Sequence, residues 1–276
     1  MVRKVRRTYR ELGVGAHGSV EELEADGTTY AGKRIHDALV EFEDNLVSQR
    51  FVSECQLMSE LRHPHVVQFI GVCFFVGSRF PILVMEFLPE NLDHLLEATP
   101  KIPLFLKRSI LHDVALGLAY LHGRDPPIIH RDLTARNVLL NSDMRAKIAD
   151  FGVARILDLQ PRSRITMTQA PGNFTYMPPE ALSTKPTYDV KIDIFSFGHL
   201  ALFTITQVFP NLLPPTYTSH EEPGQIIGRS ETERRVHEME LLHQQLGGQH
   251  PFVQLVIACL RNRAELRPSV QQVCFR

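Results

Sequence analysis

The chain of 276 residues contains no tryptophan and only four cysteines. These cysteines form no Cys-x-x-Cys pair, which argues against both a disulfide framework and a zinc site. We therefore expect free thiols in a reducing compartment and a cytoplasmic location. The formal net charge is −1 at pH 7. This overall charge gives no indication of nucleic-acid binding, so we expect no nucleic-acid partner.

Long apolar runs are also absent. The longest, at residues 200–209, is interrupted by threonines and Gln207 and is too short to span a bilayer. No secretory signal pattern opens the chain. Apolar residues make up 43% and charged residues 22%, a composition typical of a globular domain. We expect a domain without a membrane span. The same composition would also suit a domain from a longer protein with flanking regulatory domains.

One local excess of charge occurs near the start, in a basic segment with Arg3, Lys4, Arg6, Arg7 and Arg10. Such a segment could bind an acidic membrane or partner. We expect a solvated terminal arm instead, because clustered charges of one sign are usually solvated.

What the sequence does contain is a fixed arrangement of two acids and an amide. Residues 129–140 carry Asp132 and, five residues later, Asn137, and Asp150 then opens an Asp-Phe-Gly triplet. Transfer of a phosphoryl group needs such a set. One carboxylate orients the attacking hydroxyl and accepts its proton, while the other carboxylate and the amide oxygen hold Mg²⁺ against the phosphates. A surface turn before two buried strands is the alternative, but both motifs rarely occur in this order by chance.

These two segments resemble the catalytic loop and the magnesium loop of protein kinases. Upstream, residues 12–20 match the family's Gly-x-Gly-x-x-Gly-x-Val loop. The continuation through Asp26-Gly27 predicts strand, tight turn and strand, whereas dinucleotide-binding folds continue into a helix. Glycines suit such a loop because its backbone must approach phosphates closely.

Lys33 stands where this family carries a lysine on its third strand, and its partner should be a glutamate on the following helix. Residues 51–61 have the apolar spacing of an amphipathic helix that ends before Pro64. We favour Glu54 as the partner of Lys33 over Glu60, which lies nearer the end of that helix.

The resemblance extends from about residue 9 to about residue 272 and implies an α+β, bilobal protein kinase fold. Residues 1–87 would form a small β-rich N-terminal lobe with one main helix, and residues 88–276 a larger, mostly helical C-terminal lobe. ATP and Mg²⁺ would be the cofactors, and a protein the substrate.

By the same resemblance, the catalytic residues are Asp132, Lys33, Glu54 and Arg136, and the Mg²⁺ ligands are Asn137 and Asp150. The residues that would bind the nucleotide are Leu12, Gly13, Gly15, Gly18, Val20, Ala31, Lys33, Met85, Glu86, Leu88 and Leu139. Among them Val20, Ala31 and Leu139 would enclose adenine, and the backbone of residues 86–88 would form hydrogen bonds with it.

Further residues complete the resemblance. Asp193 opens a helix that corresponds to the family's buried-aspartate helix, and Glu180 is expected to pair with Arg267 because a buried carboxylate needs a partner. Met58, Phe69, His130 and Phe151 are expected to stack between the lobes. The loop between residues 150 and 180 offers Ser163, Thr166 and Thr168, and we favour phosphorylation of Thr166 or Thr168, paired with Arg131, as a switch that orders this loop. A loop that is ordered without phosphorylation is the alternative.

The sequence departs from the family at several positions. Thr134 and Arg136 resemble the loop of tyrosine kinases, whereas residues 172–180 lack the tyrosine-kinase pattern. This mixture resembles the tyrosine-kinase-like group, so we favour Ser or Thr as the acceptor, with a tyrosine kinase as the alternative. A pseudokinase scaffold that binds ATP without transfer is a further alternative. Phe195 replaces the family's usual tryptophan, and Gly32 stands where an apolar residue normally precedes the lysine.

Overall fold

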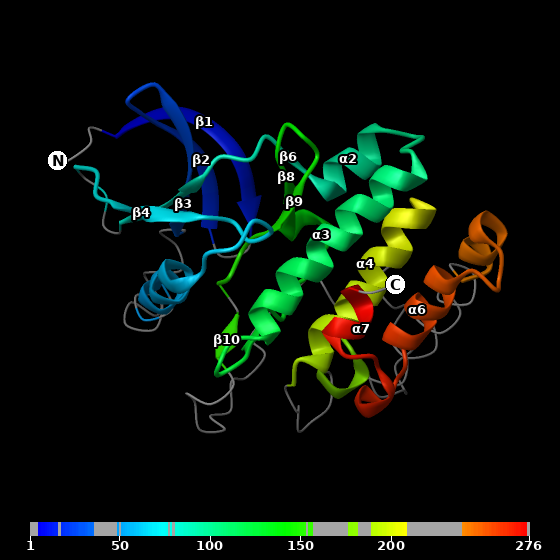
Figure 1. Cartoon of the computed structure of the whole chain (residues 1–276). Coiled ribbons are helices and arrows are strands. Elements are labelled where there is room, and N and C mark those ends of the chain that lie inside the picture. Colours follow the sequence, from blue (N-terminus) through cyan, green and yellow to red (C-terminus); the bar gives the residue numbers. More distant parts are fainter. Residues whose placement is uncertain are drawn as a thin grey trace, which may run out of the picture.

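The computed structural model describes residues 5–15, 18–35, 49, 51–76, 78, 81–152, 154–156, 176–181, 189–208 and 239–274. The expected phosphorylation sites Ser163, Thr166 and Thr168 lie outside these residues. An N-terminal sheet with one helix adjoins a mostly helical C-terminal part (Figure 1). This is the predicted α+β arrangement, while the lobe boundary at residue 87 stays a prediction.

Five antiparallel strands form the N-terminal sheet in the order β1-β2-β3-β5-β4. They are β1 (Arg6–Gly15), β2 (Gly18–Ala25), β3 (Thr28–Ile35), β4 (Phe69–Cys73) and β5 (Ile82–Glu86). The predicted turn at Asp26-Gly27 joins β2 to β3. Its φ angles are 52° and 73°, and a two-residue hairpin turn of this kind requires two positive φ values.

A helix at residues 51–60 covers one face of this sheet. Its buried side chains Phe51, Leu57 and Met58 belong to the same core as Leu83 and Met85 of β5. The amphipathic helix predicted before Pro64 is therefore present, and its apolar side explains where it docks.

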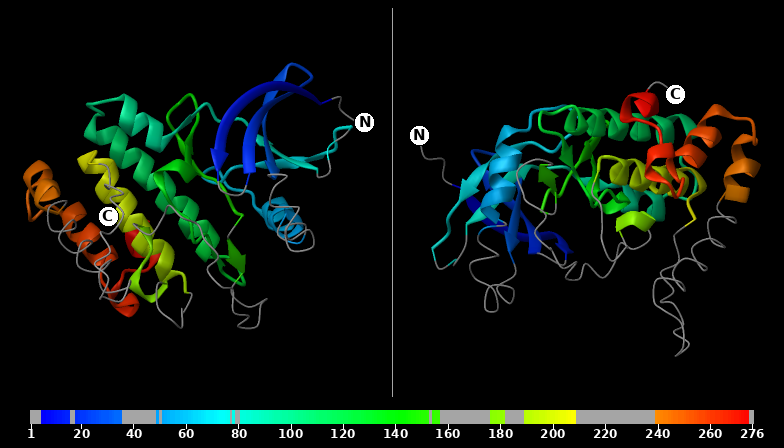
Figure 2. Two further views of the ribbon diagram at one scale, coloured as in Figure 1. Left: turned by 180° about the vertical axis from the view of Figure 1, so that it is seen from behind. Right: turned by 90° about the horizontal axis from the view of Figure 1, so that it is seen from below.

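Helices dominate the C-terminal part, where α3, α4, α6 and α7 pack together (Figure 2). The helices are α2 (Leu92–Ala98), α3 (Leu104–His122), α4 (Lys191–Thr206), α6 (Pro251–Cys259) and α7 (Val270–Cys274), with a further helix at residues 239–246. The short strands of this part form two small sheets. One contains β6 (Glu90–Asn91), β8 (Val138–Leu140) and β9 (Ala146–Ile148), and the other pairs β7 (Ile128–Ile129) with β10 (Arg155–Ile156). Among the described residues, short 3₁₀ segments occur at η1 (Ala135–Asn137), η3 (Pro179–Ala181) and η4 (Ala264–Leu266).

Helix α4 is the centre of this part, because every residue from Ile192 to Thr206 is buried. The hydroxyls of Thr204 and Thr206 donate hydrogen bonds to backbone carbonyls one turn earlier in the helix, at 2.7 and 2.8 Å. The ammonium of Lys107 from α3 donates to the carbonyl of Ile205 at 2.7 Å and so caps the end of the helix. The apolar run at residues 200–209 is thus largely a core helix. Within the described residues, no helix has the length and apolar character needed to cross a membrane.

The described part of the basic segment, which contains Arg6, Arg7 and Arg10, is not the solvated arm that we expected, while Arg3 and Lys4 lie outside the described residues. Residues 6–10 belong to β1, and their arginines pair with glutamates of β2. The pairs are Arg6–Glu24 at 2.6 Å, Arg7–Glu21 at 2.8 Å and Arg10–Glu22 at 3.0 Å. Strand pairing places opposite charges close together, which offsets the positive charge of these three arginines.

All four cysteines are free, as expected from their spacing: Cys55, Cys73, Cys259 and Cys274. The pKa of each thiol is raised, chiefly by burial, to about 11 for Cys55 and to about 12 for Cys259. These thiols are therefore protonated at neutral pH. The reducing compartment itself stays a prediction.

Gly32 faces the side of the sheet opposite Lys33, where space is already filled. A Cβ at this position would lie 2.6 Å from Cδ1 of Leu23 and 2.9 Å from Cγ2 of Ile82, and both side chains are fully buried. Two large neighbouring side chains thus fill the space that a side chain at residue 32 would need. Their packing gives a physical reason for this departure from the family pattern.

Gly32→Ala should lower the free energy of unfolding by about 1–3 kcal/mol, because it overpacks a filled core. Gly71→Ala is the matched control, since a Cβ on Gly71 of β4 meets nothing within 4 Å. Urea unfolding of the two variants checks this prediction. Equal stability of Gly32→Ala and wild type would contradict it.

Candidate active site

Lys33 is the point where three separate segments meet. Its ammonium on β3 lies 2.7 Å from Oε1 of Glu54 on the helix at residues 51–60 and 2.8 Å from Oδ1 of Asp150. The side chains of Lys33 and Glu54 are 14% and 9% exposed. The predicted choice of Glu54 over Glu60 is confirmed as geometry, because Glu60 points to solvent.

The charges in this cluster stabilise one another. Burial lowers the pKa of the Lys33 ammonium, but Asp150 and Glu54 outweigh that effect, so its pKa is raised overall. Burial also raises the pKa of Asp150, whereas Lys33 and the N–H of Gly152 lower it, and the net value is about 2. Lys33 and Asp150 are therefore both charged at neutral pH.

Asp132 and Asn137 are held together within the catalytic loop. The Nδ2 of Asn137 donates to the backbone carbonyl of Asp132 and to its Oδ2, both at 2.8 Å. Neither bond uses the amide oxygen of Asn137. The carbonyl of Asn137 accepts the N–H of Ala149 at 2.8 Å, so the loop is anchored next to Asp150.

The side chain of His130 contacts this loop through both of its ring nitrogens. One ring nitrogen, Nε2, lies 2.9 Å from the carbonyl of Ala149, and the other, Nδ1, lies 3.3 Å from the N–H of Asp132. A carbonyl can only accept and an N–H can only donate, so these partners select the neutral tautomer with the proton on Nε2. The ring also meets Phe151 edge-on, with centroids 5.1 Å apart.

Asp193, fully buried at the start of α4, holds the backbone of the loop. Its carboxylate accepts the N–H groups of His130 and Arg131, each at 2.8 Å, and lies 2.8 Å from Nε2 of His122. Burial opposes its charge, but His122 and these donors outweigh it and lower the pKa of Asp193. Arg131 has a φ of 70°, a strained conformation for a residue with a side chain. The sequence indicates a buried Asp193 but not these partners.

Four of the expected nucleotide-binding residues of the sheet lie on one face. In the strand register Gly13 is opposite Val20, Val20 is opposite Lys33, and Ala31 is opposite Met85. Directly paired residues of antiparallel strands point to the same face, as do residues two apart. Val20, Ala31, Lys33 and Met85 therefore share a face.

The other expected nucleotide-binding residues lie at the edge of the sheet or next to the main core. Gly15 pairs with Gly18 where β1 meets β2, Leu12 is half-buried, and Leu88 and Leu139 pack against the main core. The N–H of Glu86 donates to the carbonyl of Gln68 at 3.0 Å. Adenine could therefore use only the carbonyl of residue 86.

Arg136 points toward α2. Its Nε lies 2.9 Å from Oδ2 of Asp93, and its side chain is 78% exposed. Thr134, at the other position that resembles a tyrosine kinase, is buried. The structure thus ties the guanidinium of Arg136 to the helix that follows β6.

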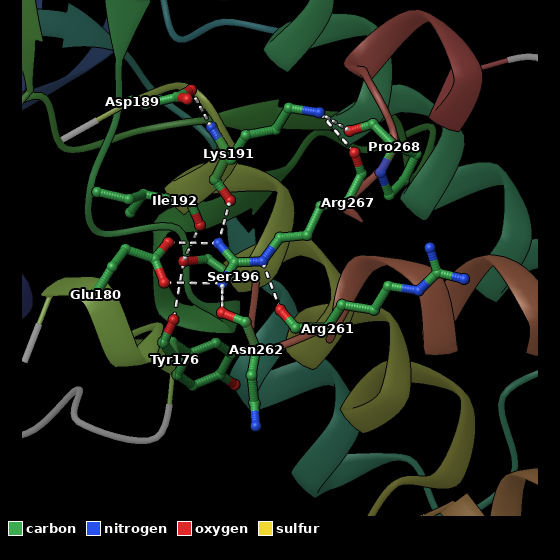
Figure 3. Close-up of polar contacts among 10 residues, drawn as sticks. All are labelled: Tyr176, Glu180, Asp189, Lys191, Ile192, Ser196, Arg261, Asn262, Arg267 and Pro268. Carbon is green, nitrogen blue, oxygen red and sulfur yellow. Dashed lines mark hydrogen bonds and ion pairs between the residues drawn. The ribbon is translucent and has the colours of Figure 1, made fainter. Parts of the chain in front are cut away.

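The expected pair of Glu180 and Arg267 is present and lies in a wider network (Figure 3). The guanidinium of Arg267 binds both carboxylate oxygens of Glu180 and donates to the carbonyls of Lys191, Arg261 and Asn262. Its centre also lies 4.8 Å from the ring centroid of Phe195. Phe195 cannot donate as tryptophan would, but its ring still stacks a cation.

The sequence of residues 6–275 matches the family described as the protein kinase domain. The chain therefore belongs to this family. The fold and the arrangement of Lys33, Glu54 and Asp150 agree with the match, and the motifs at residues 130–137 and 150–152 lie within it.

Several curated proteins are similar over much of the chain. A probable leucine-rich repeat receptor-like protein kinase from Arabidopsis thaliana is 30% identical over 269 residues, which is 95% of this chain and 23% of that protein. The serine/threonine-protein kinase VIK from the same plant is 37% identical over 192 residues, 68% of this chain and 42% of that protein. The human serine/threonine-protein kinase TNNI3K is 40% identical over 149 residues, 54% of this chain and 18% of that protein. The chain thus spans less than half of each relative.

Glu180→Gln should lower the free energy of unfolding by about 3 kcal/mol or more, because it leaves the buried guanidinium of Arg267 without a charge partner. The matched control is Glu265→Gln, which breaks a pair with Arg263 on the surface and should have no measurable effect. Chemical denaturation of both variants measures the difference. Equal small effects would show that the pair at Arg267 contributes little.

Lys33→Met should raise the pKa of Asp150 from about 2 toward its ordinary value of 3.8, because the cation that opposes the effect of burial most strongly is then gone. In the wild type the pKa is depressed in the folded state. Its contribution to stability is therefore present above pH 3.8 and is lost as the pH falls through about 2. A titration of the side-chain carboxyl carbon by NMR checks the shift, and an unchanged pKa in Lys33→Met would contradict it.

Proposed function

We propose that this domain transfers the γ-phosphate of ATP to a serine or threonine hydroxyl of a protein substrate. The observation that carries the proposal is the ammonium of Lys33, held at 2.7 Å from Glu54 and 2.8 Å from Asp150. Asp150 is joined to the catalytic loop through the hydrogen bond from Ala149 to Asn137. Phosphoryl transfer depends mainly on such positioning and on charge stabilisation.

In this proposal the polar residues of the site have distinct roles. Lys33 contacts the α- and β-phosphates and is held in place by Glu54. Asp132 orients the substrate hydroxyl and accepts its proton, and Asn137 fixes the position of the Asp132 carboxylate through the bond at 2.8 Å. Adenine lies against Val20, Ala31 and Leu139, next to the carbonyl of Glu86 and the backbone of Leu88.

Asn137 and Asp150 fit the requirements of a Mg²⁺ site. Asp150 is ionised because its pKa is about 2, and the amide oxygen of Asn137 takes no part in the bonds to Asp132. Both supply oxygen ligands, and Mg²⁺ is commonly bound by one or two protein ligands together with phosphates. Within the described part of the chain, no group of three or more His, Cys, Asp or Glu could hold a metal alone. A bound Mg²⁺ would neutralise charge on the phosphates.

Two observations favour Ser or Thr over Tyr as the acceptor. Two of the relatives above are named serine/threonine-protein kinases. In addition, Arg136, which would help to place a phenol in a tyrosine kinase, is bound to Asp93 on α2. Together with the pattern of residues 172–180, this supports membership of the tyrosine-kinase-like group. The whole protein's substrate, cytoplasmic location and flanking domains belong to the same proposal.

Asp132→Asn should lower kcat by about 10²- to 10⁴-fold, because the amide cannot accept the proton of the substrate hydroxyl. The variant should keep the thermal shift produced by Mg²⁺-ATP. Transfer is measured with labelled ATP and a peptide library that offers Ser, Thr and Tyr, followed by identification of the modified residue.

Three outcomes would count against the proposal. Equal transfer by wild type and Asp132→Asn would exclude the assigned role of Asp132. Phosphotyrosine alone would favour the tyrosine kinase alternative. Binding of Mg²⁺-ATP without transfer, under activating conditions, would favour a scaffold.

A further inference from the structure

Glu86, at the end of β5, is bound from two sides. Its Oε1 accepts the N–H of Gln68 at 2.8 Å and the ammonium of Lys147 at 2.6 Å, and its Oε2 lies 2.8 Å from the same ammonium. The N–H of Glu86 donates in return to the carbonyl of Gln68 at 3.0 Å. The peptide that follows Met85 is thus fixed through both its backbone and its side chain.

Lys147 lies on β9, three residues before Asp150. The backbone of the adjacent Ile148 makes two hydrogen bonds. Its N–H donates to the carbonyl of His65 at 3.0 Å, and its carbonyl accepts the N–H of Val67 at 2.9 Å. The segment that carries Lys147 therefore has little freedom to shift. The side chains of Lys147 and Glu86 are 18% and 25% exposed, so solvent screens their attraction less than it screens a pair on the surface.

We propose that Lys147 is a positioning residue for the nucleotide. The ion pair of Lys147 and Glu86 joins the peptide that would bind adenine to the segment that leads into Asp150, which would bind Mg²⁺. Adenine and the phosphates are two ends of one ligand, so the two binding groups must stay at a matched separation. This inference rests on the proposed function, because it assumes that one nucleotide reaches both groups.

Lys147→Met keeps the length of the side chain and removes its charge. We expect the Kd of Mg²⁺-ADP, measured by titration calorimetry, and the KM for ATP to rise about fivefold. The kcat should change by less than about twofold, since the lost interaction acts on binding in the ground state and the transition state alike. Lys147→Arg should restore both constants to near the wild-type values.

Glu86→Gln tests the same pair from the other side, and the substitution alters only the side chain of residue 86. It should raise the Kd of Mg²⁺-ADP to a similar extent. The double variant of Lys147→Met with Glu86→Gln should bind no more weakly than either single variant, because both remove one interaction. Additive losses in the double variant would overturn the inference.

The matched control is Arg145→Met, which removes another cation next to β9. Arg145 pairs with the buried Asp113 at 2.7 and 2.8 Å, and it has no place in the proposed nucleotide site. This control should lower Tm and leave the Kd of Mg²⁺-ADP and the KM for ATP unchanged.

Two results would overturn the positioning role: an unchanged Kd in Lys147→Met, or an equal rise in Kd in Arg145→Met. Because ADP binding does not require transfer, the two proposals can fail separately. A wild type that transfers no phosphate, with ADP affinity that depends on Lys147, would overturn the proposed function alone.

Discussion

The ammonium of Lys33 between two carboxylates is the interaction on which the site depends. It joins a strand, a helix and the segment at Asp150, which come from three distant parts of the chain. Without the cation, the carboxylates of Glu54 and Asp150 would be two charges of the same sign with no shared partner between them. The position of the helix at residues 51–60 and the ionisation of Asp150 are therefore linked through one side chain.

A second constraint holds the catalytic loop in a conformation that it would not adopt alone. Arg131 and Asp150 have φ values of 70° and 62°, although neither is glycine. Strained backbone of this kind persists where surrounding contacts enforce it. At Arg131 the buried Asp193 supplies those contacts, and Asp150 is held by Lys33 and Gly152. The acids that we assign to catalysis and metal binding thus stand on backbone fixed by charged hydrogen bonds.

Gly32 and Phe195, two positions where the chain departs from its family, have neighbours that explain them. Leu23 and Ile82 occupy the space that a side chain at residue 32 would need. Phe195 lacks the donor of the usual tryptophan, but the guanidinium of Arg267 stacks over its ring while bonding to Glu180 and three carbonyls. In both cases the packing around the residue, and not the residue alone, preserves the local structure.

The sequence by itself determined the chemistry of the site and the local elements. The spacing of Asp132, Asn137 and Asp150, the turn at Asp26-Gly27 and the helix that ends before Pro64 all depend on residues close together in the chain. Only the tertiary structure decided which distant groups meet. Arg6, Arg7 and Arg10 meet glutamates of β2, and Glu86 meets Lys147 across 61 positions of sequence. Such contacts depend on strand register and packing, which no local pattern specifies.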